Sequence, residues 1–200
     1  RTNAQPKSVS QFARSLRIDT AIARRHCPGN GWRGMSVSDT KPPHRNIEFK
    51  ARLTSLAAAR EIAASIATSG PEQQHQIDTY FVCAQGRLKL REIAGQTAQL
   101  VSMLAQTAPI PEPAITDSPR RVQIVVEKHR EIFLHHNVRI HLDEVLGLGD
   151  FLEFEAVLDG DHDDATGQSQ VEHLAARFGI AASDVVACSY SDLLKTSQSA

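Results

Sequence analysis

The chain has 200 residues, of which 41% are hydrophobic and 22% are charged, and 22 basic residues nearly balance 23 acidic ones. These fractions are typical of a globular domain and exclude collagen-like, coiled-coil and wholly disordered chains, while the net charge of -1 argues against a globally basic nucleic-acid-binding protein. No apolar run of about 18 residues is present, so no membrane span is expected, and the three widely spaced cysteines form no disulfide framework or metal motif and favour a reducing, cytoplasmic location.

Residues 1–45 differ in composition from the rest of the chain. They are rich in arginine and lysine, poor in acidic residues, and contain the structure-breaking stretches PGNG and KPP. We expect them to form a disordered or leader segment, with an organellar transit peptide as the sharper alternative. The folded domain is expected over residues 46–195.

The folded domain begins with residues that alternate between polar and apolar, which predicts a β-strand with the sequence NIEFKARL. An alanine-rich helix follows and ends at Gly70-Pro71, and a hairpin is expected around Gly86. In chain order, the expected elements are a strand at 46–53, a helix at 54–69, and strands at 77–82, 87–92 and 98–104.

Proline-rich residues 105–121 show no period and are expected to be a loop. Two long strands flank the turn His135-His136-Asn137. The remaining expected elements are strands at 122–134, 138–146 and 151–158, an acidic solvated loop at 159–168, and an amphipathic helix at 170–178.

The expected strands share one property: a charged face and an apolar face. An ordinary antiparallel sheet with one wet face shows the same alternation and is kept as an alternative. Two facts argue against it: the charged faces contain almost no Ser, Thr, Asn or Gln, and the signs of charge are segregated by strand. These faces carry the cations Lys50, Arg52, Arg87, Lys89, Arg91, Lys128, Arg130 and Arg139, the carboxylates Glu48, Asp143, Glu153 and Glu155, and His141.

The excess of cations on these faces indicates an anionic ligand. A barrel with the charged faces inward could not be empty and dry, because burying unpaired charge is too costly. Arg and Lys are the natural partners of phosphate oxygens, and a triphosphate carries about four negative charges. Clustered carboxylates supply the hard oxygen ligands that Mg²⁺ and Mn²⁺ prefer. The charge pattern therefore suggests a metal–triphosphate site.

The chain resembles the CYTH domain, the superfamily of class IV adenylate cyclases and thiamine triphosphatases. The resemblance lies in NIEFKARL (46–53), GRLKLRE (86–92), NVRIHLDEVLGLGDFLEFE (137–155) and SYSDLL (189–194). It implies an α+β fold, an antiparallel β-barrel tunnel of about eight strands with helices packed outside, over residues 46–195.

The resemblance also implies roles for the charged residues. It implies that the metal, Mg²⁺ or Mn²⁺, is bound by Glu48, Asp143, Glu153 and Glu155. It implies that phosphate oxygens are bound by Lys50, Arg52, Lys89, Arg91, Lys128, Arg130 and Arg139, of which Lys50 and Arg139 are the expected catalytic residues. Arg87 has the same parity and is expected near the tunnel mouth.

Two positions depart from the family pattern. Asn46 stands where the opening ExExK signature has its first Glu, which removes one carboxylate. Leu104 and Ala105 stand where the family has an acid and an Arg, and the short 105–121 segment replaces a longer stretch. Either one or two barrel elements are missing, or this segment reflects an error in the reading frame.

The leading functional hypothesis is metal-dependent hydrolysis of a small triphosphate, either tripolyphosphate or thiamine triphosphate. The alternatives are a class IV adenylate cyclase, a degenerate tunnel that binds polyphosphate or nucleotides without turnover, and a β-sheet interaction module. Hydrolysis is preferred because aromatic residues make up only 5% of the chain, which leaves few partners for stacking on a base. The expected partner is a small triphosphate, with neither nucleic acid nor membrane involved, and the sequence does not predict an oligomeric state.

Overall fold

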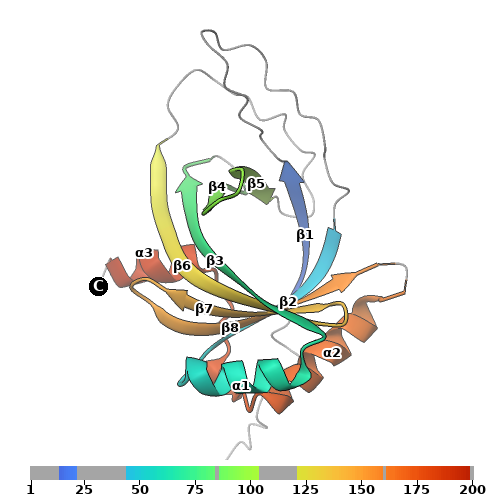
Figure 1. Ribbon diagram of the computed structural model, residues 1–200. Helices are drawn as coiled ribbons and strands as arrows, with labels where there is room; N and C mark the ends of the chain where they lie inside the picture. The colour runs from blue at the N-terminus through green and yellow to red at the C-terminus, as the bar shows by residue number, and fades with distance from the viewer. Residues whose placement is uncertain (1–13, 22–43, 84–85, 104–120, 160, 199–200) are drawn as a thin grey trace, which may run out of the picture.

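Eight antiparallel strands close into a barrel in the order β1-β2-β8-β7-β6-β3-β4-β5 (Figure 1). The computed structural model describes residues 14–21, 44–83, 86–103, 121–159 and 161–198. The strands are β1 (Arg14–Ala21), β2 (His44–Arg52), β3 (Ser69–Phe81), β4 (Arg87–Ile93), β5 (Gln99–Met103), β6 (Val122–His135), β7 (Val138–Val145) and β8 (Gly149–Leu158). The helices are α1 (Leu56–Ile66), α2 (Asp164–Arg177) and α3 (Tyr190–Gln198), with one 3₁₀ turn, η2 (Ala182–Asp184). The expected α+β barrel with outer helices is confirmed.

Strand β1 closes the barrel and lies within the segment that the sequence suggests is a leader or disordered. It pairs with β2 on one side and with β5 on the other, so that neither β2 nor β5 has a free edge there. The division into a segment at 1–45 and a domain at 46–195 stays a prediction, to which the structure adds one strand from the first segment. The loop expected at 105–121 lies, apart from Arg121, outside the described residues.

Two elements are longer than their sequence patterns indicate. Strand β3 starts at Ser69, eight residues before the expected start at 77, because its first half pairs with the end of β6. Helix α2 starts within the expected acidic loop: the Asp163 side chain accepts a hydrogen bond of 2.8 Å from the Thr166 backbone N–H and caps the helix. Helix α3 was not predicted.

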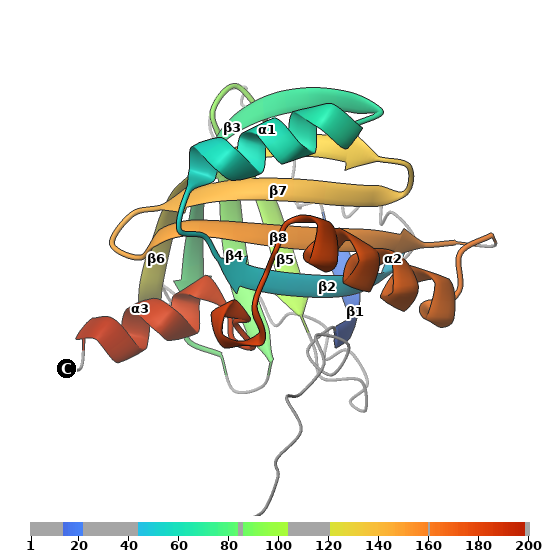
Figure 2. The same cartoon turned by 90° about the horizontal axis from the view of Figure 1, so that it is seen from below.

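The hydrophobic core lies outside the barrel wall, between the apolar strand faces and two helices. Helices α1 and α2 cross the outer surface of β7, β8 and β2 (Figures 1 and 2). Gly167 permits the close approach of α2, since a Cβ there would meet Leu158 Cδ2 at 2.7 Å and Ile47 Cγ1 at 3.1 Å. The main contributors to this core are Ile47, Phe49, Ala59, Ala63, Phe133, Val138, Ile140, Leu142, Leu152, Phe154, Val171 and Leu174.

This packing explains the two faces of β2, β7 and β8. Their apolar face is covered by helices α1 and α2, so the opposite, charged face is turned to the barrel interior. Within the described residues, no helix is long and apolar enough to cross a membrane.

Candidate functional site

Most of the charged side chains that the sequence places on one face meet inside the barrel. The buried ones are Lys89, Lys128, Arg130, His141 and Asp143, and the half-buried ones are Glu48, Lys50, Arg91, Arg139, Glu153 and Glu155. They come from β2, β4, β6, β7 and β8, and the cross-strand pairing brings residues of opposite sign together, as in Lys50 opposite Glu153 and Arg139 opposite Glu155.

Asp143 is the most enclosed of these residues, with no exposed surface. Its two oxygens each accept a hydrogen bond of 2.6 Å from the Arg130 guanidinium, Lys128 Nζ lies 3.3 Å away, and the Tyr190 hydroxyl donates at 2.8 Å. Burial alone would raise the pKa of Asp143, but the charges of Arg130 and Lys128 outweigh burial and hold it well below its usual range. With both oxygens already engaged, Asp143 fits the role of a fixed counter-ion better than that of a metal ligand.

Asp78 on β3 forms a second such cluster, which the sequence analysis missed. Lys89 Nζ donates to Asp78 Oδ2 at 2.9 Å, and the Arg91 guanidinium makes two hydrogen bonds of 2.8 Å to the same carboxylate. Burial opposes ionisation of Asp78, yet the Arg91 hydrogen bond and the Lys89 charge hold its pKa well below the usual range. The missed signal was the polar alternation Gln74, Gln76, Asp78, which extends the strand toward its N-terminal end.

Glu153 and Glu155 on β8 pair with Lys50 and Arg139, and Glu153 also contacts the Arg130 that Asp143 holds. Glu153 lies 3.1 Å from Arg130 Nη2 and 3.4 Å from Lys50 Nζ. Glu155 lies 3.1 Å from Arg139 Nη1 and accepts a hydrogen bond from the Asn46 amide nitrogen. Asp78, Asp143 and Glu153 are therefore each shared by two cations, which leaves the interior with a surplus of positive charge.

Burial shifts two interior lysines toward neutrality. It lowers the pKa of Lys128 to about 7, with the nearby Arg130 adding to the effect, and that of Lys89 to about 8, with a further contribution from Arg91. Repulsion from the neighbouring arginine adds to the effect of burial in both cases, and the carboxylates Asp143 and Asp78 oppose it.

Glu48 has no hydrogen bond or ion pair with another described residue, although it lies opposite Glu155 in the β2–β8 ladder. Burial, followed by repulsion from Glu153 and Glu155, raises the pKa of Glu48 to about 7 despite the opposing charge of Lys50. The Asn46 Oδ1 atom is buried on the same face and has no hydrogen-bond partner among the described residues. A cation bound beside Glu48 and Asn46 would offset the carboxylate repulsion and would give the Asn46 oxygen a partner.

A divalent metal ion fits this corner of the tunnel. Within the described residues, no three His, Cys, Asp or Glu side chains are already arranged as a metal site. However, Asn46 Oδ1 and the carboxylates of Glu48 and Glu155, with Glu153 adjacent, are hard oxygen ligands, and a cation would offset the repulsion that raises the Glu48 pKa. The Asn46 that replaces a family Glu thus still offers an oxygen.

Helix α3 closes one end of the tunnel. Tyr190 and Leu194 pack there on Val126, Val145 and Phe151, which occupy inward positions of their strands. The Tyr190 ring lies 4.9 Å from that of Phe151, and Lys50 Nζ sits 4.2 Å from the Tyr190 ring centroid. Because Tyr190 is distant in sequence from every strand, no periodicity could have placed it in the barrel.

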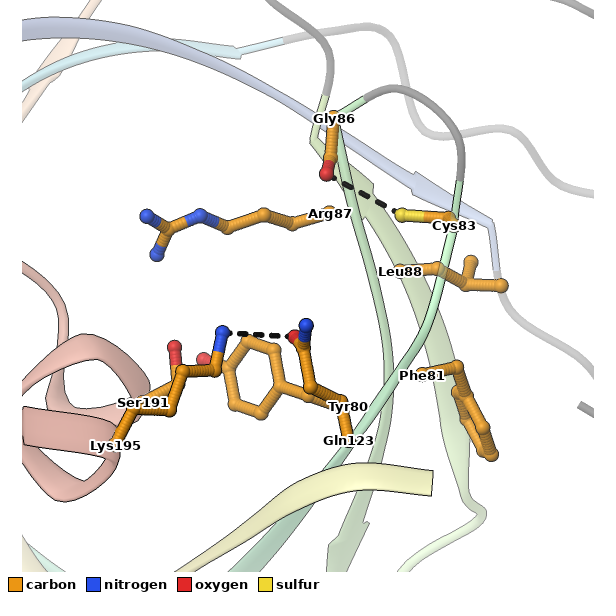
Figure 3. A pocket seen from close by; sticks show the side chains of 9 residues that line it. All are labelled: Tyr80, Phe81, Cys83, Gly86, Arg87, Leu88, Gln123, Ser191 and Lys195. Carbon is orange, nitrogen blue, oxygen red and sulfur yellow. Dashed lines mark hydrogen bonds between the residues drawn. The ribbon is translucent and has the colours of Figure 1, made fainter. Parts of the chain in front are cut away.

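Arg52, which was expected to bind phosphate, lies at this closed end rather than inside the tunnel, and Arg87, which was expected near the tunnel mouth, lies there as well. Arg87 bonds to the Ser189 hydroxyl and makes a 2.6 Å ion pair with Asp192 Oδ2, so it fastens β4 to the start of α3. A small cavity of about 60 Å³ lies beside it, and Lys195 crosses that cavity to donate a 2.8 Å hydrogen bond to Gln123 (Figure 3). Arg52 is exposed, with its guanidinium 4.9 Å from the Phe151 ring centroid and a hydrogen bond to the Leu148 carbonyl.

A larger cavity of about 620 Å³ opens at the other end of the barrel. Its ionisable lining consists of Arg91, Arg130, Arg139, His141, Glu155 and Glu72, and its amide lining consists of Gln74, Gln76, Gln96 and Gln99. Burial lowers the pKa of His141 well below its usual range, so this side chain is neutral. The cavity combines three arginines with a set of hydrogen-bonding side chains.

The comparisons agree with this architecture. The family model described as the CYTH domain matches residues 44–190. The chain belongs to the CYTH family. As the family implies, it is therefore a tunnel protein of the triphosphate-binding enzyme class, in which metal dependence is general. No curated protein matches the chain.

Three solved structures share the CYTH fold with this chain. PH1012 from Pyrococcus horikoshii is 27% identical, with a TM-score of 0.57, and the alignment covers 74% of this chain and 98% of that one. A conserved hypothetical protein from Pyrococcus furiosus is 17% identical, with a TM-score of 0.57 and coverage of 74% and 99%. A candidate adenylate cyclase from Vibrio parahaemolyticus is 20% identical, with a TM-score of 0.57 and coverage of 75% and 97%.

Proposed function

We propose that this CYTH domain is a metal-dependent triphosphatase that hydrolyses a small triphosphate such as tripolyphosphate or thiamine triphosphate. The observation that carries the proposal is the sharing of single carboxylates by pairs of cations at Asp78 and Asp143. Each carboxylate orients two cations and offsets only one of their charges, so Lys89, Arg91, Lys128 and Arg130 prepare a cationic surface for phosphate oxygens.

The side chains of this surface have different tasks. Arg91, Arg130 and Arg139 line the open cavity and would bind and orient the phosphate chain. Lys89 and Lys128 lie deeper and would stabilise charge on the innermost phosphate. Lys50, held between Glu153 and the Tyr190 ring, would act with Arg139 on the charge that develops on the leaving phosphate oxygen.

A bound Mg²⁺ or Mn²⁺ would supply charge neutralisation and an activated water at the phosphate. The residues that would hold it are Glu48 and Glu155, with Asn46 Oδ1 and Glu153 beside them. Arg52 and Arg87, which contact the Leu148 carbonyl and Asp192, are left outside the proposed site, and Asp143 remains the counter-ion of Arg130.

Cyclisation of ATP is the second candidate, because a cavity of about 620 Å³ has room for a nucleoside in addition to phosphates. The test incubates the protein with Mg²⁺ or Mn²⁺ and either tripolyphosphate or ATP and identifies the products by phosphorus NMR. Orthophosphate from tripolyphosphate is expected. Pyrophosphate with cyclic AMP from ATP would replace hydrolysis by cyclisation, and binding without any product would indicate a degenerate tunnel.

A further inference from the structure

Three side chains on β3, Gln76, Gln74 and Glu72, are linked by hydrogen bonds along the wall of the open cavity, and we call this chain the relay. Gln76 is 2% exposed, and its amide nitrogen donates to Gln74 Oε1. The Gln74 amide nitrogen in turn donates to Glu72 Oε1 at 2.6 Å. All three side chains line the cavity, and Glu72 is at its exposed edge.

The carboxylate at the end fixes the direction of the relay. Ionised Glu72 can only accept hydrogen bonds, so Gln74 must turn its NH₂ group toward Glu72 and its oxygen toward Gln76. Gln76 must then give its NH₂ group to Gln74 and turn its own oxygen away. Reversing either amide would bring two acceptor oxygens together, so the hydrogen-bond chemistry fixes the orientation of Gln76.

The Gln76 Oε1 atom is consequently a buried acceptor in a cationic cavity. It has no hydrogen-bond partner among the described residues. Arg91 donates to Asp78, and Arg130 donates to Asp143 and Glu153, and no described donor reaches the Gln76 oxygen. A buried acceptor without a donor is unfavourable, so a ligand group that reached this oxygen would gain by donating a hydrogen bond to it.

Phosphate cannot be that donor. The oxygens of an ionised triphosphate accept hydrogen bonds, and they would be repelled by the Gln76 oxygen as they are attracted by Arg91 and Arg130. The donor must therefore belong to another part of the substrate. The two further amides of the lining, Gln96 and Gln99, extend this uncharged, hydrogen-bonding part of the cavity.

Resting on the proposed triphosphatase function, we propose that Gln76 Oε1 accepts a hydrogen bond from an N–H or O–H group on the organic part of the substrate. The preferred substrate class is then an organic triphosphate that carries such a donor, rather than inorganic tripolyphosphate. Gln76 is a specificity-determining residue in this assignment, and Glu72 and Gln74 are positioning residues that hold its oxygen toward the ligand.

The test compares dissociation constants by titration calorimetry for tripolyphosphate, thiamine triphosphate and α,β-methylene-ATP. Gln76→Leu should weaken binding of at least one organic triphosphate about 5- to 30-fold, the loss expected for one hydrogen bond, and change tripolyphosphate affinity less than about twofold. Gln73→Leu is the matched control, because Gln73 is an exposed neighbour on the same strand. Glu72→Gln, which permits the relay to reverse, should reproduce part of the Gln76→Leu effect.

Two outcomes would overturn the assignment. An equal loss of affinity for tripolyphosphate would place Gln76 in the phosphate site. A lower kcat on tripolyphosphate with unchanged affinity for all three ligands would mean that Gln76 orients a water molecule. Failure of wild-type protein to bind tripolyphosphate at all would instead contradict the proposed function, so the two proposals fail in distinguishable ways.

Discussion

Asp78 and Asp143 are the counter-ions that allow the tunnel interior to contain so many basic side chains. Each is buried, each accepts hydrogen bonds from an arginine in a two-point arrangement, and each also holds a lysine. A carboxylate in this position is stabilised by its partners, and the partners are stabilised by it, so removing either leaves an uncompensated buried charge. The counter-ions are therefore as important to the site as the cations that would contact phosphate.

Replacing Asp78 with Asn should strongly destabilise the protein, because Lys89 and Arg91 would face each other without a counter-ion. We expect a loss of about 3–5 kcal/mol in the free energy of unfolding, the usual result of breaking a buried ion pair. Urea unfolding followed by circular dichroism measures it. Tripolyphosphate should restore part of the lost stability, since its negative charge would take the place of the carboxylate.

The matched control is Asp164→Asn, which breaks the exposed ion pair with Arg45 on the outer surface. A change of less than about 1 kcal/mol is expected there. If Asp78→Asn were no more harmful than this control, the interior pairs would contribute little, and the account of Asp78 as an essential counter-ion would be wrong.

Glu48→Gln should stabilise the metal-free protein at pH 8. The pKa of Glu48 is raised to about 7 in the folded state from an ordinary value of 4.5, so ionisation disfavours folding as pH rises between these values. An uncharged amide removes this penalty, a gain on the order of 1–3 kcal/mol at pH 8 that should vanish near pH 4, where the carboxyl group is protonated in both states. Thermal unfolding at the two pH values measures it.

The same variant should lose the stabilisation that Mg²⁺ or Mn²⁺ gives the wild-type protein, because a charged oxygen ligand is gone. Glu61→Gln, on the exposed face of α1, serves as the control and should change stability by less than about 0.5 kcal/mol at either pH. Undiminished stabilisation of Glu48→Gln by Mg²⁺ would remove Glu48 from the proposed metal ligands.

At the level of strands and helices, the period-2 pattern predicted the features that depend on a single strand, namely where it begins and ends and which of its faces is turned inward. In β2, β7 and β8 it identified the boundaries to within two residues and most of the inward residues, because each strand carries a charged face and an apolar face. It missed the first half of β3, where glutamines alternate with other polar residues and hydrophobic contrast is lost. It also missed β1, although Leu16 and Ile18 alternate there with Arg17 and Asp19.

Helix α3 shows why part of the site could not be predicted. The insertion of Tyr190 and the use of Arg87 as a fastener depend on where the end of the chain meets the barrel. Where the chain end packs on the barrel depends on the tertiary structure. Arg87 lies on the same face of β4 as Lys89 and Arg91, yet only Lys89 and Arg91 reach Asp78. The pattern gave the face correctly and left depth along the tunnel undetermined.

Strand β4 offers a direct test of this difference in depth. Arg91→Ala should weaken tripolyphosphate binding by about 1–3 kcal/mol, the contribution of a charge-assisted hydrogen bond. Arg87 lies four positions before Arg91 on the same face of the strand. Arg87→Ala should leave the affinity for tripolyphosphate within about twofold and instead lower thermal stability through the loss of the Asp192 ion pair. Titration calorimetry and thermal unfolding separate the two effects, and equal losses of affinity would place Arg87 in the phosphate site.

For the whole molecule, the described residues form a barrel with a charged interior, one end filled by a helix and one end open. Helices α1 and α2 bury the apolar outer face, α3 fills one end, and the cavity opens at the other. Under the proposed function, substrate and product would share the opening that the described residues line, and a triphosphate would enter with its terminal phosphate first. The organic group would then lie near the glutamines of the open end, which is consistent with the specificity that we propose for Gln76.

Triphosphate binding should draw protons from solution at alkaline pH. The pKa of Lys128 is lowered to about 7 and that of Lys89 to about 8, so both are largely neutral at pH 9. A bound polyanion favours the charged forms and raises both pKa values, so protons are taken up on binding, and affinity should fall as pH rises from 7 to 9. Calorimetry with tripolyphosphate at pH 9, in EDTA and in two buffers of different ionisation enthalpy, gives the number of protons. Lys89→Arg, which keeps its charge, should reduce that number. A binding heat independent of buffer would show that these lysines do not face the phosphate.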